Sequence, residues 1–106
     1  MKIALDYDGT YTQDPEIWDL FLYNFWQRGH DVRVVTHRHA ELDKIEDLPL
    51  GTQIIYTDGV AKKWYCEHRE PFWVPDIWID DKPKGILENG PLDMETIQKW
   101  RDNGYK

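Results

Sequence analysis

The chain has 106 residues, enough for one compact domain but not for two, so we expect a single domain over residues 1–106. Its formal net charge of −7 argues against strong nonspecific binding to nucleic acid or to an anionic membrane, because such binding needs a positively charged face. The single cysteine, Cys66, cannot form an internal disulfide, and no signal-like start or long apolar run is visible. The cytoplasm is therefore the expected location, and we expect no membrane partner.

The first predicted strand is an apolar run over residues 2–6. A turn follows, and Asp14 and Pro15 then form a typical helix start, with a capping carboxylate and a proline in the first turn. Apolar side chains recur at helical spacing until Gly29, which would end the helix at about residue 28. The stripe consists of Ile17, Leu20, Phe21 and Phe25, widened by Trp18, Leu22 and Trp26.

Further strands are predicted over residues 32–36, 53–56 and 76–80. Helices are predicted over residues 38–46, over about 58–68, and from Pro91 to just before Gly104, the last with Leu92, Ile97 and Trp100 on one side. Strands that alternate with helices indicate right-handed βαβ units and a mostly parallel sheet that is covered on both faces. The predicted fold class is therefore α/β with three layers.

Two of the predicted strands end in a pair of acidic residues. Asp6 and Asp8 follow the first strand, and Asp80-Asp81 follows the last. Because parallel strands share one direction, the strand ends that carry Asp6, Thr36 and Asp80 should lie at one edge of the sheet. Carboxylates at strand ends can hold a divalent cation such as Mg²⁺, and one of them can also act as a nucleophile. We therefore expect one shared site.

The same residue types suit phosphoryl transfer. A phosphoryl group repels a carboxylate nucleophile unless a cation lies between them, and its equatorial oxygens need donors such as a hydroxyl, a lysine and backbone amides. Thr36 supplies a hydroxyl, and the helix after the third strand supplies Lys62 and Lys63. These two lysines lie about 100° apart around a helix, so they compete for the role of phosphate donor.

The motifs resemble those of the haloacid dehalogenase superfamily, whose members are mostly phosphohydrolases. In chain order they are D-Y-D-G-T at residues 6–10, Thr36, a lysine on a later helix and D-D at residues 80–81, so the resemblance covers nearly the whole chain. It implies a Rossmann-like sheet with the strand order 4-1-2-3. It also implies a Mg²⁺-dependent phosphomonoester hydrolase that works through an aspartyl phosphate.

The resemblance also implies roles for the four carboxylates. Asp6 would be the nucleophile and a metal ligand. Asp8 would be the general acid for the leaving oxygen and then the base for the attacking water, and its backbone carbonyl would touch Mg²⁺. Asp80 would bind the metal directly. Asp81 would either bind the metal as well or form a hydrogen bond to one of the ligands.

Thr36 and a lysine would hold the phosphoryl oxygens, and the spacing in the family favours Lys62 over Lys63. If neither lysine served, Lys82 would be the next candidate, because it directly follows the acidic pair. His37 and His39 flank Arg38 just after the second strand, where they either contact the substrate or form a polar loop. The residues expected to contact the substrate are Gly9, Thr10, His37, Arg38 and Lys63.

The chain departs from many members of the family because it has no room for a cap domain. One helix fills the interval between Asp8 and the second strand, and the interval from Thr36 to Lys62 is equally short. An open site favours a bulky substrate, a partner that closes the pocket, or weak discrimination. Among uncapped members, bacteriophage-type proteins and polynucleotide 3′-phosphatase domains look most similar in layout, so the expected substrate is a phosphorylated small molecule or a nucleic-acid end.

Two other functions compete with hydrolysis. The chain could be a catalytically weak or inactive module that binds metal or phosphate and acts through a partner. It could also be a receiver-like domain, but receivers place their acid pair ahead of the phosphorylated residue, whereas Asp8 comes two residues after Asp6. The receiver reading therefore fits poorly.

Overall fold

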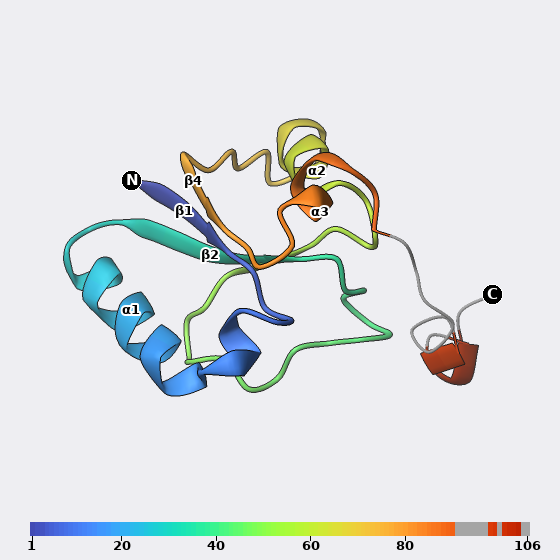
Figure 1. The fold of residues 1–106 in the computed structure, drawn as a ribbon, viewed down its shortest axis with the longest axis horizontal. Helices are drawn as coiled ribbons and strands as arrows, with labels where there is room; N and C mark the ends of the chain where they lie inside the picture. The colour runs from blue at the N-terminus through green and yellow to red at the C-terminus, as the bar shows by residue number, and fades with distance from the viewer. Residues whose placement is uncertain (91–97, 100, 105–106) are drawn as a thin grey trace.

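A parallel sheet with helices on both faces forms the centre of the protein (Figure 1). The structure, a computed structural model, describes residues 1–90, 98–99 and 101–104. Its four strands are β1 (Lys2–Leu5), β2 (Asp31–Thr36), β3 (Ile54–Tyr56) and β4 (Ile77–Ile79), in the order β3-β2-β1-β4. All three strand pairs are parallel. The predicted α/β class and the strand order 4-1-2-3 are confirmed, and no cap domain accompanies the sheet in the described part of the chain.

The helices are short except for one. They are the 3₁₀ turn η1 (Tyr11–Gln13), α1 (Pro15–Gln27), α2 (Lys62–His68) and α3 (Lys84–Leu87). The Asp14 side chain caps α1 as expected, accepting a hydrogen bond of 3.3 Å from the amide of Ile17. None of the described helices is both long enough and apolar enough to cross a bilayer.

Two hydrophobic clusters cover the two faces of the sheet. Ile3 and Leu5 of β1 belong to the cluster beneath α1, where Leu22 is fully buried. Ala4 points to the opposite face and packs in the second cluster with Cys66 of α2. This alternation is what a strand covered on both sides requires. The three predicted layers are therefore confirmed, and Cys66 is buried in the second cluster.

The packed side of α1 contains five of the seven residues of the predicted stripe and differs from it at Ile17 and Leu20. Ile17 and Leu20 are 57% and 60% exposed, although both were expected in the core. The side chains that pack against the core are Trp18, Phe21, Leu22, Phe25 and Trp26. The helix is oriented so that its large aromatic residues face the core, because each of them buries more apolar area than an aliphatic residue does.

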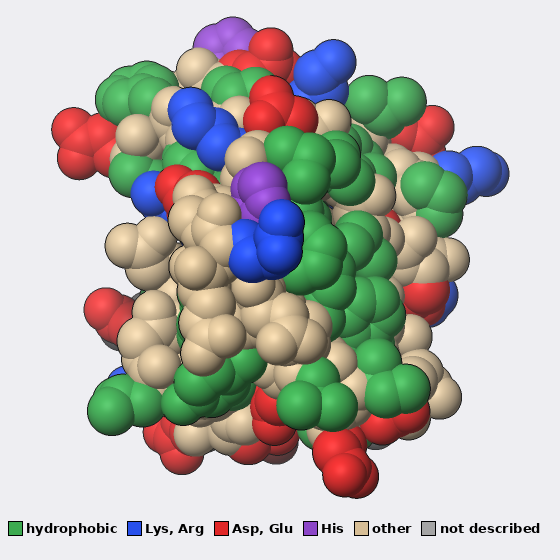
Figure 2. Space-filling model, turned by 90° about the vertical axis from the view of Figure 1, so that its left-hand side faces the viewer, with side chains coloured by type: hydrophobic (Ala, Val, Ile, Leu, Met, Phe, Trp, Pro, Cys, Tyr) green, Lys and Arg blue, Asp and Glu red, His purple; other side chains and the backbone are tan. Residues whose placement is uncertain are grey.

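The side of the molecule that lies at the left of Figure 1 carries hydrophobic, acidic and basic side chains together (Figure 2). Hydrophobic side chains reach this surface at several places. Ile17, Leu20 and Tyr23 of α1 are each more than half exposed. Lys and Arg side chains are scattered there. This side therefore presents no broad basic area of the kind that binds nucleic acid without sequence preference.

The segment after β2 is wrongly predicted as a helix. Residues 38–46 form turns and irregular backbone, so the acidic stretch at 41–47 is not a helix face. Other contacts hold the polar groups of this segment: within it Arg38 Nη1 lies 3.2 Å from Asp43 Oδ1, and from β3 the Tyr56 hydroxyl accepts a hydrogen bond from the amide of Ile45. A weak helical pattern loses to such contacts.

Other element boundaries also shift. α2 starts at Lys62 and not near residue 58, because Asp58 and Gly59 adopt positive φ angles of 53° and 77° that end any helix there. The short helix α3 was not predicted. The helix predicted from Pro91 lies mostly outside the described residues.

Candidate functional site

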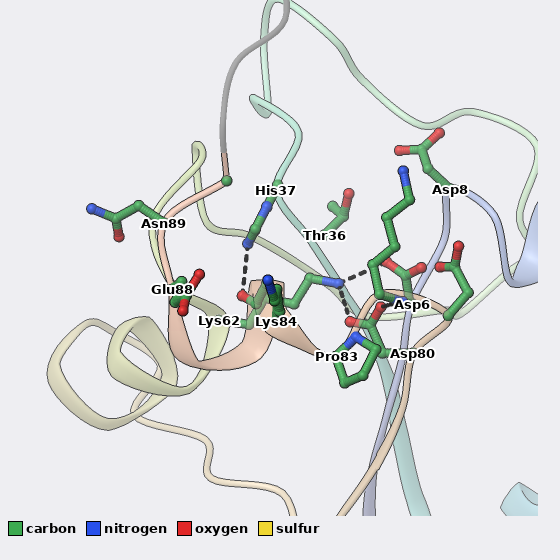
Figure 3. A pocket seen from close by; sticks show the side chains of 14 residues that line it. Asp6, Asp8, Thr36, His37, Lys62, Asp80, Pro83, Lys84, Glu88 and Asn89 are labelled. Atoms are coloured by element: carbon green, nitrogen blue, oxygen red, sulfur yellow. Dashed lines mark hydrogen bonds and ion pairs between the residues drawn. The ribbon is translucent and has the colours of Figure 1, made fainter.

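The carboxyl ends of three strands meet at one pocket, as the sequence predicts. Asp6 follows β1, Thr36 ends β2 and Asp80 follows β4, and all three line a pocket of about 700 Å³ (Figure 3). The amide of Asp6 donates a 2.9 Å hydrogen bond to the carbonyl of Ile79, which holds the ends of β1 and β4 together. The start of α2 and the segment 82–90 complete the lining.

A buried lysine links two of the carboxylates. Lys62 is the first residue of α2 and is only 4% exposed. Its Nζ lies 2.7 Å from Asp6 Oδ1 and 2.7 Å from Asp80 Oδ2. A buried ammonium needs such partners, because an unpaired charge in the interior is strongly destabilising. Lys62 therefore ties the end of β1 to the end of β4.

A second group of contacts joins Asp6 to Asp81 through Thr10. Thr10 Oγ1 lies 3.1 Å from Asp6 Oδ2 and 3.2 Å from Asp81 Oδ1, and it accepts a hydrogen bond from the amide of Asp81. Burial raises the pKa of Asp6 to about 7, although Lys62 acts in the opposite direction. A hydrogen bond from Asp6 lowers the pKa of Asp81. Thr10 therefore lies between the carboxylates of Asp6 and Asp81 and contacts both.

Three of the four predicted metal ligands lie together. Asp6, Asp80 and Asp81 each offer one carboxylate oxygen, and these oxygens lie within 4.8 Å of one another. A donor set made of oxygen alone suits hard cations such as Mg²⁺ and Ca²⁺ and not zinc, which takes nitrogen and sulfur ligands in most sites. The arrangement is a possible metal site. The identity of the ion stays a prediction.

Asp8 stands apart from this group. Its side chain lies at the rim of the pocket and is 55% exposed (Figure 3). Both of its oxygens accept hydrogen bonds from Arg38, at 2.8 Å from Nε and 2.7 Å from Nη2. The Arg38 guanidinium also stacks over the ring of Tyr7, with 4.8 Å between its central carbon and the ring centroid. The Asp8 carboxylate is therefore held outside the cluster that contains Asp6.

The remaining predicted residues divide into two groups. Thr36 and His37 line the pocket, and Thr36 Oγ1 accepts a 3.2 Å hydrogen bond from the amide of Arg38. Thr10 contacts the carboxylates directly. Lys63 is exposed on α2 and does not line the pocket, so of the two lysines the structure brings only Lys62 to the carboxylates. The catalytic roles of all these residues stay predictions.

Sequence reasoning named only Lys82 from one wall of the pocket, which the segment 82–90 forms. Within it, Asn89 Oδ1 accepts a 2.9 Å hydrogen bond from the amide of Ala61 and so caps α2, which has no side-chain cap of its own. The signal in the sequence is the polar stretch Lys82-Pro83-Lys84-Gly85, directly after the acidic pair, followed by Asn89-Gly90. Such a stretch reads as an ordinary turn, so its place in the pocket was not evident.

Gly9 supports a testable prediction. Its φ is +86°, and a Cβ there would overlap the Asp81 carboxylate. Gly51 has a similar φ of +91° but has no atom within 4 Å of the corresponding position. Both Gly→Ala variants should lose roughly 1 kcal/mol of stability or somewhat more, because alanine is strained at positive φ.

Only Gly9→Ala should also displace Asp81 and weaken Mg²⁺ binding, by about tenfold if one ligand is lost (roughly 1.4 kcal/mol). Thermal unfolding and calorimetric titration of the two variants check this expectation. Equal metal affinity in the two variants would show that Asp81 does not depend on the space left by Gly9.

Comparison of the chain with models of protein families, with curated proteins and with solved structures found no match. The chain is a small α/β domain with a four-stranded parallel sheet and an acidic cluster that could bind a metal ion.

Proposed function

We propose that this protein is a Mg²⁺-dependent phosphomonoester hydrolase of the haloacid dehalogenase type, with an aspartyl phosphate formed on Asp6. One observation carries the proposal: the buried Lys62 ammonium lies 2.7 Å from both Asp6 and Asp80 at the strand ends. A structural ion pair needs one acid, whereas this lysine meets two inside an open pocket. That combination supports a site in which Asp6 would be the nucleophile, Lys62 a positive charge and Asp80 a metal ligand for one phosphoryl group.

The donor set fits the metal. Asp6, Asp80 and Asp81 offer oxygen ligands only, and Mg²⁺ sites in phosphoryl-transfer enzymes use few carboxylates and leave the remaining positions to water and to phosphate oxygens. When bound, Mg²⁺ would supply the positive charge that offsets repulsion between these carboxylates and the oxygens of the substrate.

The residues of the chain then divide the reaction into two steps. In the first, an Asp6 oxygen attacks phosphorus, the bond from phosphorus to the leaving oxygen breaks, and Asp8 gives that oxygen its proton. In the second, Asp8 takes a proton from water, the water oxygen attacks phosphorus, and the bond to Asp6 breaks. The products are an alcohol and inorganic phosphate, and Asp6 returns to a free carboxylate.

Lys62 and Thr36 serve as donors in this proposal. Charge on the equatorial phosphoryl oxygens must be met by fixed donors that already point at it. The Lys62 ammonium has three hydrogens, of which two point at Asp6 and Asp80, so the third is available to a phosphoryl oxygen. The Thr36 side chain lines the same pocket from β2.

Asp8 favours a second candidate function. Arg38 holds both of its oxygens, so the Arg38 pair has to separate before Asp8 can exchange protons with a substrate. If the pair persists, the pocket retains its metal ligands and its lysine but lacks an acid. The protein would then be a metal- or phosphate-binding module that acts through a partner.

Removal of the metal separates the two candidates. With Mg²⁺ we expect phosphate release from a generic aryl phosphate, its loss in EDTA and its return with excess Mg²⁺. Saturating Mg²⁺ should also raise the free energy of unfolding, by about 2.7 kcal/mol at a hundredfold excess over Kd. The Asp80→Ala variant should lose most of this stabilisation by the metal. Asp58→Asn, at an exposed turn residue, is the control and should keep it.

Equal activity with and without metal would contradict the role of Mg²⁺. Metal binding without turnover of any phosphoester would favour the binding module over the hydrolase.

A further inference from the structure

We propose that the substrate of this site carries a second phosphate group, bound by Lys82 and Lys84 on the segment 82–90. The proposal rests on the proposed hydrolase function and adds the class of substrate. The pocket is the first reason. Its volume of about 700 Å³ is far more than one phosphoryl group fills, and pockets of roughly 300–1,000 Å³ hold whole small ligands. The pocket therefore has room for the leaving group.

The charge of this wall is the second reason. Lys82 and Lys84 both line the pocket, and within the described residues neither ammonium forms an ion pair. Both lysines are exposed, and no acidic side chain of the described residues holds them, so both ammoniums can contact a ligand in the pocket. The segment adds one acid to the pocket, Glu88, which leaves the wall with a net positive charge.

The position of Lys82 is fixed close to the phosphoryl site. Its amide donates a 2.9 Å hydrogen bond to Asp80 Oδ1, the carboxylate whose other oxygen meets Lys62. Pro83 then restricts the backbone before Lys84. Lys82 therefore lies next to the carboxylates of the site, and Lys84 lines the same pocket.

The rest of the wall is held against the sheet and α2. His37 Nε2 lies 2.9 Å from the carbonyl oxygen of Gly85, a contact that is drawn in Figure 3. Both glycines of the segment pack on the His37 ring, where an added Cβ would lie 2.9 Å from Cε1 at Gly85 and 2.5 Å from Nδ1 at Gly90. The Gly90 amide also donates to the carbonyl of Gly59. The wall is therefore formed before a ligand binds, which lowers the entropic cost of binding.

The ligand chemistry follows from these groups. An ammonium is a compact point charge that binds phosphate well. Beside Lys82, Lys84, Glu88 and Asn89, which are all polar, this wall contains the apolar ring of Pro83. An apolar leaving group would leave both lysines without a partner. A second phosphate would satisfy them, and it could belong to a nucleoside bisphosphate or to the next phosphodiester of a nucleic-acid end.

The experiment compares substrates that differ by one phosphate. We would measure kcat/KM for a nucleoside 3′-monophosphate, for the 3′,5′-bisphosphate of the same nucleoside, and for a dinucleotide with a 3′-phosphate. For the wild type, kcat/KM should be about tenfold higher or more for the bisphosphate or the dinucleotide than for the monophosphate. A factor of this size is what one good ionic contact contributes. The better of the two identifies the source of the second phosphate.

The double variant Lys82→Met/Lys84→Met should bring this ratio close to one. The control is Lys2→Met/Lys44→Met, which removes the same charge at exposed positions outside the pocket and should keep the ratio. A wild-type ratio near one, with measurable turnover of the monophosphate, would overturn the second-phosphate site and leave the hydrolase standing.

Absence of turnover with every phosphomonoester would overturn the hydrolase and not the binding site. In that case calorimetric titration with the bisphosphate and the monophosphate decides. Tighter binding of the bisphosphate that disappears in the lysine double variant supports the inference, and equal binding of the two ligands overturns it.

Discussion

Replacement of Asp6 by Asn is expected to lower kcat by several orders of magnitude while the fold stays intact. An amide cannot act as the nucleophile that the proposed mechanism requires. Asn has nearly the same shape as Asp, and its carbonyl oxygen can still accept a hydrogen bond from Lys62, which lies 2.7 Å away in the wild type. Steady-state kinetics with a saturating aryl phosphate, together with circular dichroism, checks this expectation.

The matched control is Asp58→Asn. Asp58 is exposed, and its φ of 53° is one that asparagine tolerates well, so this variant has the same change of charge without a change in the pocket. It should retain wild-type kcat. If Asp6→Asn kept near-normal kcat and undiminished metal binding, covalent catalysis by Asp6 would be wrong.

Replacement of Lys62 by Met should have the second large effect, on both stability and turnover. It leaves Asp6 and Asp80 buried without their ammonium, and breaking a buried ion pair costs about 3–5 kcal/mol. Turnover should be lost because a phosphoryl oxygen loses its donor. Mg²⁺ should recover part of the stability, since a bound cation again offsets the two carboxylates. Denaturant unfolding with and without Mg²⁺, and kinetics with Mg²⁺, measure these effects.

Lys63→Met provides the adjacent control on the same helix. Lys63 is exposed and outside the pocket, so its removal should change stability by less than about 0.5 kcal/mol and leave turnover unchanged. If turnover were lost in Lys63→Met and not in Lys62→Met, Lys63 and not Lys62 would be the lysine that holds the phosphate. The carboxylate site would be unaffected by that result.

Much of the fold could be predicted because its signals are local. Short apolar runs alternate with helical patterns, and parallel connection then places Asp6, Thr36 and Asp80 at one sheet edge. The predicted helix at 38–46 failed for a different reason: its backbone is held by contacts with residues far away in sequence, such as the Tyr56 hydroxyl. A pattern that is weak locally does not report such contacts.

The site could be predicted in its residue types but not in its side-chain directions. The choice of Lys62 over Lys63 depends on where α2 starts, which the backbone turn at residues 58–59 decides. The direction of Asp8 depends on Arg38, thirty residues away, whose guanidinium holds both carboxylate oxygens. α3 has only four residues, too few for a periodic pattern, so the wall that carries Lys84 had no helical signal.

The most direct test of the proposed covalent mechanism is a rapid acid quench of the enzyme during turnover, followed by peptide mapping by mass spectrometry. The Asp8→Asn variant should be used beside the wild type, because loss of the base for the attacking water should slow hydrolysis of the intermediate. The account predicts one phosphoryl group on the peptide that contains Asp6, labile to hydroxylamine as an acyl phosphate is, and absent in Asp6→Asn. Steady turnover with no phosphoryl group on Asp6, or with the group on another residue, would contradict the account.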